Sequence, residues 1–81
     1  MYVPITSEIT IAIGTELREI STEQIFVVTD RIKGSPEISG EDVWRIIPIM
    51  SPGIERIALT LSRQELSQKY FVLESDIPVD H

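Results

Sequence analysis

The chain has 81 residues, enough for one domain with a small hydrophobic core. It contains no cysteine, which excludes disulfides, thiolate zinc sites and a cysteine nucleophile, and favours a reducing cytoplasm. The net charge of −6 disfavours nucleic acid as a ligand. Because the sequence has no bilayer-length apolar run and no signal-peptide pattern, we expect a soluble, cytoplasmic single domain over residues 1–81. Its core should span about 8–74, with tails at 1–7 and 75–81.

The aliphatic composition favours strands over helices. The chain has 14 Ile and 6 Val but only 5 Leu and 2 Ala. Branching at Cβ suits a pleated sheet and restricts side chains in a helix. We therefore expect an all-β, mainly β fold.

Two strands are expected in the first half of the chain. Residues 8–13 alternate polar and apolar side chains, which predicts a half-buried strand. A polar connection follows Gly14. Residues 24–32 predict a second strand, in which Phe26, Val28 and Ile32 share one face.

The middle of the chain predicts a loop, a strand and a tight turn. Glycine and proline within 33–42 predict a loop. Residues 43–49 predict a strand that ends at Pro48 or lies at an edge, because proline cannot donate a ladder hydrogen bond. The turn at 50–54 centres on a Pro-Gly pair of type II character.

The C-terminal part combines a strand, a short helix and a final strand. Residues 55–61 alternate cleanly, with Ile57, Leu59 and Leu61 expected to point inward. Ser62 and Glu65 form a capping-box pattern that starts a helix of about two turns. The helix should direct Leu66 inward, and residues 70–73 read as strand again.

This order of elements resembles the small Src-homology-3-like barrels. The likeness rests on Gly14-Thr15-Glu16 after the first strand, the hairpin at 50–54, and Ser62 to Leu66 before Tyr70. The resemblance implies a five-stranded barrel with one short helical turn before the last strand. It names no specific family and no activity, because one fold hosts many functions.

Catalysis, metals and cofactors are not expected. The single histidine, His81, is the last residue and makes a poor proton-transfer group. The glycines are isolated and form no phosphate-binding loop, and no calcium-loop pattern is present. We therefore expect no enzyme activity, no cofactor and no bound metal.

The surplus of apolar residues in two strands is the main functional signal. Strand 43–49 has Trp44 and Ile46 on one face and three further aliphatic residues on the other. Ile25 and Val27 likewise lie opposite Phe26 and its neighbour. Either the terminal tails cover the second face, or another protein or a second copy does. The predicted partner-binding residues are Trp44, Ile46, Ile25 and Val27.

On this basis the chain is expected to be a non-enzymatic protein-interaction module. It is similar in kind to phage or mobile-element accessory proteins that bind and modulate a host protein, and a homodimer is a second option. An alternative is an acidic mimic of nucleic acid, using the clusters at Glu16, Glu19, Glu23 and at Glu37, Glu41, Asp42. A further alternative is a nucleic-acid-binding barrel with an anion patch. Its residues would be Arg31, Lys33, Arg45 and Arg56, unless they pair with nearby acids.

Overall fold

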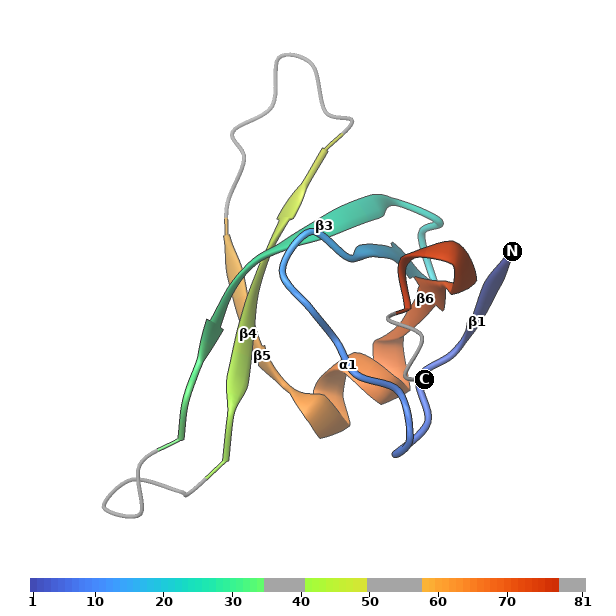
Figure 1. The fold of residues 1–81 in the computed structure, drawn as a ribbon. Helices are drawn as coiled ribbons and strands as arrows, with labels where there is room; N and C mark the ends of the chain where they lie inside the picture. The colour runs from blue at the N-terminus through green and yellow to red at the C-terminus, as the bar shows by residue number, and fades with distance from the viewer. Residues whose placement is uncertain (35–40, 50–57, 78–81) are drawn as a thin grey trace.

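The computed structural model describes residues 1–34, 41–49 and 58–77 (Figure 1). Within them the chain forms six strands, one α-helix and one 3₁₀ turn. No helix in these three segments is both long and apolar enough to cross a membrane. The elements are β1 (Tyr2–Pro4), β2 (Glu16–Glu19), β3 (Ile25–Ile32), β4 (Val43–Pro48), β5 (Leu59–Ser62), α1 (Arg63–Lys69), β6 (Tyr70–Leu73) and η1 (Glu74–Asp76).

All six strands belong to one antiparallel sheet in the order β1-β6-β2-β3-β4-β5. The mainly β prediction is therefore confirmed. The five-stranded closed barrel is wrong in two respects, because β1 adds a sixth strand and no ladder joins β1 to β5 among the described residues. The sheet has two edges instead of closing on itself, with α1 leading from β5 back to β6 (Figure 1).

The N-terminal strand prediction is wrong in its position. Residues 8–13 are not strand, although Ile11 is fully buried, whereas Ile13 is 67% exposed. The strand lies further on, at β2, where Leu17 is the one core residue between polar neighbours. Within the segment assigned to an N-terminal tail, residues Tyr2–Pro4 form β1, which pairs with β6.

The C-terminal helix is confirmed in detail. The Ser62 hydroxyl accepts a hydrogen bond from the Glu65 backbone N–H, and the Glu65 carboxylate accepts one from the Ser62 N–H. This reciprocal capping satisfies two backbone donors that the first helical turn leaves unpaired. Leu66 then reaches the core with no exposed surface, and β6 begins at Tyr70 as predicted.

The core lies between the inner face of the sheet, α1 and the segment before β2. Phe26 and Tyr70 meet edge to face at its centre, with ring centroids 5.4 Å apart. Val3 and Ile77 pack against it from the two ends of the described chain. The fully assembled core comprises Ile5, Ile11, Leu17, Phe26, Val28, Trp44, Ile46, Leu66, Tyr70 and Val72.

A β-bulge in β3 changes which side chains face inward. The register with β4 shifts between Val28 and Asp30, so one extra residue is inserted in β3. A one-residue shift moves later side chains to the opposite face. The prediction that Ile32 shares a face with Phe26 and Val28 is therefore wrong: Ile32 is 40% exposed, and Arg31 takes the inner face, opposite Trp44.

The strand predicted at 55–61 is described only from residue 58. β5 confirms its second half, but Leu59 remains 38% exposed because it lies on the edge strand. Leu61 packs against the core as predicted. The expected strand start at 55–57, the turn at 50–54 and most of the loop at 33–42 lie outside the described residues.

The capping box gives a direct test of helix stability. Ser62→Ala removes the hydroxyl that accepts the Glu65 N–H, and should lower the free energy of unfolding by about 0.5–2 kcal/mol. Urea unfolding followed by Trp44 fluorescence measures the change. Ser67→Ala, on the exposed face of the same helix, should change it by less than about 0.5 kcal/mol. Equal effects of the two variants would contradict the capping role.

The raised pKa values of Tyr2 and Tyr70 predict that the protein loses stability at alkaline pH. Burial, then the hydrogen bond to Glu16, raise the pKa of Tyr2 to about 12, and burial raises the pKa of Tyr70 to about 12. The unfolded chain loses these protons near pH 10.0, so their contribution is complete below that pH and disappears as the pH rises through 12. Urea unfolding across this range should show the decline. The double variant Y2F/Y70F should show a shallower decline; an unchanged one would contradict the assignment.

Candidate functional site: a cavity over Trp44

The four predicted partner-binding residues do not form one surface. Trp44 and Ile46 are 4% and 0% exposed and belong to the core. Ile25 and Val27 are half-buried and lie on the outer face, because side chains alternate along each strand. The structure therefore divides these residues between the core and the outer face of the sheet, and their role in partner binding stays a prediction.

A cavity of about 560 Å³ nevertheless opens over Trp44. Its walls come from three parts of the chain: the segment before β2, the facing ends of β3 and β4, and the start of α1. The lining residues are Ser7, Glu8, Ile9, Thr10, Ile11, Arg31, Glu41, Asp42, Trp44, Arg63 and Gln64.

Trp44 belongs to both the core and the cavity. Its indole N–H donates a hydrogen bond to the Ile11 carbonyl over 3.0 Å, so the buried ring has its one polar group satisfied. The Arg31 guanidinium lies over the ring, 5.6 Å from its centroid. The hydrogen bond at the ring edge and the guanidinium over the ring face together fix the position of Trp44 at the cavity.

Asp42 fixes Arg31 and joins the ends of β3 and β4. Its Oδ2 accepts hydrogen bonds from Arg31 Nε at 3.0 Å and Nη2 at 2.6 Å, while Oδ1 accepts the Gly34 N–H at 2.9 Å. The Gly34 hydrogen bond, then the Arg31 guanidinium, lower the pKa of the Asp42 carboxyl. A Cβ at Gly34 would overlap the backbone of Glu41, so glycine allows this close approach.

Arg63 holds the opposite wall. Its Nη2 donates hydrogen bonds to the backbone carbonyls of Thr6, at 2.7 Å, and Ile9. The first residue of α1 therefore holds the segment around residues 6–9 in place, although this segment pairs with no strand among the described residues. The two arginines thus hold opposite walls of the cavity through contacts within the chain.

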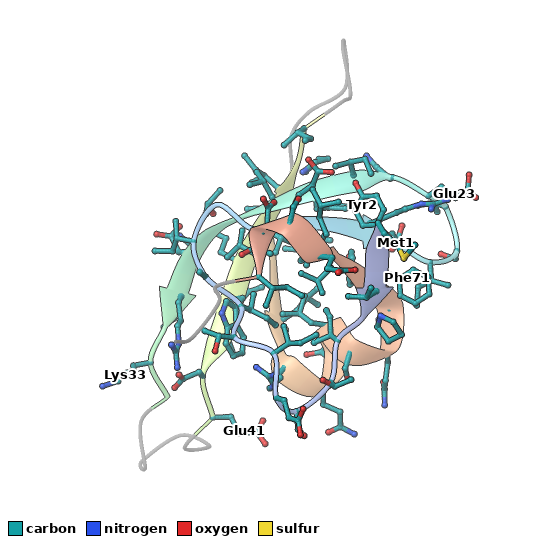
Figure 2. All side chains as sticks on the ribbon, turned by 45° about the vertical axis from the view of Figure 1, so that its right-hand side comes forward. Met1, Tyr2, Glu23, Lys33, Glu41 and Phe71 are labelled. Carbon is teal, nitrogen blue, oxygen red and sulfur yellow. The ribbon has the colours of Figure 1, made fainter. Side chains whose placement is uncertain are left out.

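The acidic residues that line the cavity differ in whether they form an ion pair. Asp42 is paired with Arg31, whereas no ion pair engages Glu8 or Glu41 among the residues that the structure describes. Both of these glutamates are exposed. Glu41 points outward at the same end of the molecule as Lys33 (Figure 2). The cavity therefore presents free carboxylates beside an aromatic floor.

The predicted anion patch is mostly neutralised. Arg31 pairs with Asp42, and Arg45 pairs with Asp30 at 3.4 Å. The expectation that these arginines pair with nearby acids is confirmed for both. Lys33 is exposed at the end of β3, and Arg56 lies outside the described residues. These cations therefore form no continuous basic surface across the described strands.

The acidic cluster of Glu16, Glu19 and Glu23 also forms hydrogen bonds and an ion pair within the chain. The Tyr2 hydroxyl donates to Glu16, the Thr22 hydroxyl donates to Glu19 at 2.5 Å, and Arg18 pairs with Glu23 at 2.7 Å. In the second cluster, Asp42 is paired and Glu37 is not described. No group of three or more histidine, cysteine, aspartate or glutamate side chains in the described segments can hold a metal ion.

Sequence reasoning missed Arg63, Glu8 and the role of Ile11. The capping box placed Arg63 at the first helical position, but nothing local showed that it reaches Thr6 and Ile9, more than fifty residues earlier. Ile11 was expected to face a core from a strand. Its side chain does lie in the core, but the segment is not a strand, and its carbonyl accepts the indole N–H. Comparison with models of protein families, with curated proteins and with solved structures found no match.

The Asp42 contacts predict an acid-dependent change at Trp44. Because the folded pKa of Asp42 is lowered from 3.8, its contribution is present above pH 3.8 and is lost as the pH falls through the lower folded value. Trp44 is the only tryptophan, so its fluorescence should report the release of Arg31 below pH 3.8.

Asp42→Asn should remove this transition, because the charge that holds Arg31 is absent at every pH. The matched control is Asp30→Asn, which breaks the exposed pair with Arg45 and should leave the transition in place. An acid titration of D42N identical to that of the wild type would contradict the assignment.

Proposed function

We propose that the chain is a non-enzymatic protein-interaction module that binds a short segment of another protein in the cavity over Trp44. The observation that carries the proposal is a cavity whose walls are already held by contacts within the chain. Walls fixed before binding lower the entropy cost of association. An aromatic floor with polar groups around it is typical of a recognition site.

The charge of the cavity favours a basic partner segment. Arg31 is neutralised by Asp42, while the carboxylates of Glu8 and Glu41 remain available. The net charge of −6 would add a long-range attraction for a basic protein and speed the encounter. A lysine or arginine side chain in the partner can approach these carboxylates and place its aliphatic part in the cavity, beside Arg31 and the edge of Trp44.

The alternatives have less support. A nucleic-acid-binding surface would need free cations, and two of its proposed arginines are paired with acids. A nucleic-acid mimic would need free acids at phosphate-like spacing, and Glu16 and Glu19 are engaged internally. A cytoplasmic accessory protein of a phage or mobile element, which acts by binding a host protein, fits the interaction module best.

Within the mainly β class, we propose a more specific fold relationship. Strands β2 to β6 follow the order β6-β2-β3-β4-β5, with α1 directly before β6. This order supports a relationship to the Src-homology-3-like folds, with β1 as an addition at one edge and with the sheet left open. Because fold does not determine function, the interaction proposal depends on the cavity alone.

Two matched variants on α1 test the cavity. Gln64 lines it, whereas Gln68 lies one helical turn further on and outside it; both are exposed. Gln64→Arg should fill the cavity and abolish capture of partner proteins from a lysate of the source cells. Gln68→Arg adds the same side chain and charge to the same helix and should leave capture unchanged. Equal capture by both variants would overturn the proposal.

The salt dependence of binding then separates the contribution of the carboxylates from that of the rest of the cavity. With the captured partner purified, Trp44 fluorescence should change on binding because this side chain lines the cavity. Added salt should slow association through screening of Glu8 and Glu41 without abolishing it. Complete loss of binding at moderate salt would favour the nucleic-acid mimic instead.

A further inference from the structure

Among the described residues, the edge strand β5 has none of the features that commonly prevent an edge from pairing with another strand. Exposed sheet edges are commonly protected by charged residues, proline or a covering element. β5 reads Leu-Thr-Leu-Ser, without charge or proline, and pairs only with β4 within the described segments. Leu59 is 38% exposed and Thr60 is also exposed. The other edge, β1, ends at Pro4, which cannot donate a hydrogen bond to an added strand.

The register of β5 shows which side chains an added strand would meet. Ile46 faces Leu59 and Trp44 faces Leu61, so both leucines lie on the inner face of the sheet. Thr60 faces Arg45 on the outer face. The strand therefore presents two apolar side chains on one face and two hydroxyl side chains, Thr60 and Ser62, on the other, where Ser62 already caps α1.

This pattern is complementary to itself. Consider two copies whose β5 strands pair antiparallel about a two-fold axis midway between their Thr60 residues. Each Thr60 then lies opposite the Thr60 of the second copy. Leu59 then lies opposite Leu61 of the second copy, on the inner face of both sheets. The pairing covers the exposed leucine and gives both edges hydrogen-bond partners.

No side chain within β5 is charged. The nearest described charge across the ladder is Arg45, which is paired with Asp30 at 3.4 Å. The overall charge of −6 disfavours association only at long range, where salt screens it. We propose that two copies of this chain associate through antiparallel pairing of β5, which joins their sheets into one continuous sheet.

The proposal is independent of the cavity, because Thr60 is not among the cavity residues. Sedimentation of the full chain from micromolar to millimolar concentration should show a monomer–dimer equilibrium that salt shifts toward the dimer. Thr60→Arg places two like charges opposite each other across the axis and should abolish the dimer. Gln68→Arg adds the same charge on the exposed face of α1 and should dimerise as the wild type does.

A second measurement does not depend on a variant. Amide hydrogen exchange within Leu59 to Leu61 should slow as wild-type protein is concentrated, while exchange in β1 stays constant; the Ser62 N–H already donates to Glu65. Folding of T60R is checked by thermal unfolding followed at Trp44. A wild-type monomer at every concentration, concentration-independent exchange in β5, or an unimpaired dimer of folded T60R would each overturn the proposal.

Discussion

One hydrogen bond organises both the core and the cavity: the indole N–H of Trp44 donates to the carbonyl of Ile11. A buried N–H left without a partner costs about 1–3 kcal/mol, so the ring and the segment before β2 stabilise each other's positions. The bond holds a non-strand segment over the inner face, where Ile11 completes the core. The same segment becomes a wall of the cavity. This contact therefore couples the packing of the core to the formation of the cavity.

The bulge in β3 determines the chemistry of the cavity. Without the extra residue after Val28, the alternation along β3 would direct Ile32 toward the inner face and Arg31 away from it. With the bulge, the guanidinium lies over Trp44 and reaches Asp42 at the start of β4. One inserted residue thus replaces an apolar neighbour of the tryptophan with a charged one, and the position of Asp42 keeps that charge balanced.

The parts of the fold that sequence predicted are those with local causes. Ser62 and Glu65 cap the helix through neighbouring atoms, and Leu66 follows from helical spacing. The alternation at 8–13 was misread because it reports side-chain burial, which Ile11 shows, and not ladder hydrogen bonding. β2 was missed because it has only one core residue between polar neighbours. The bulge and the Arg63 contacts depend on residues distant in sequence, and no local pattern predicts them.

The apolar surplus of β4 has two physical explanations, one for each face. On the inner face, Val3, Ile5 and Ile77 from the two ends of the described chain pack with the core that contains Trp44. On the outer face, Val27 and Ile47 lie directly opposite each other and are half-buried by the sheet itself. The described tail residues therefore add to the core side of β4, and a partner on the outer face stays a prediction. We assign recognition to the charged cavity at the end of the sheet, and self-association to the uncharged edge.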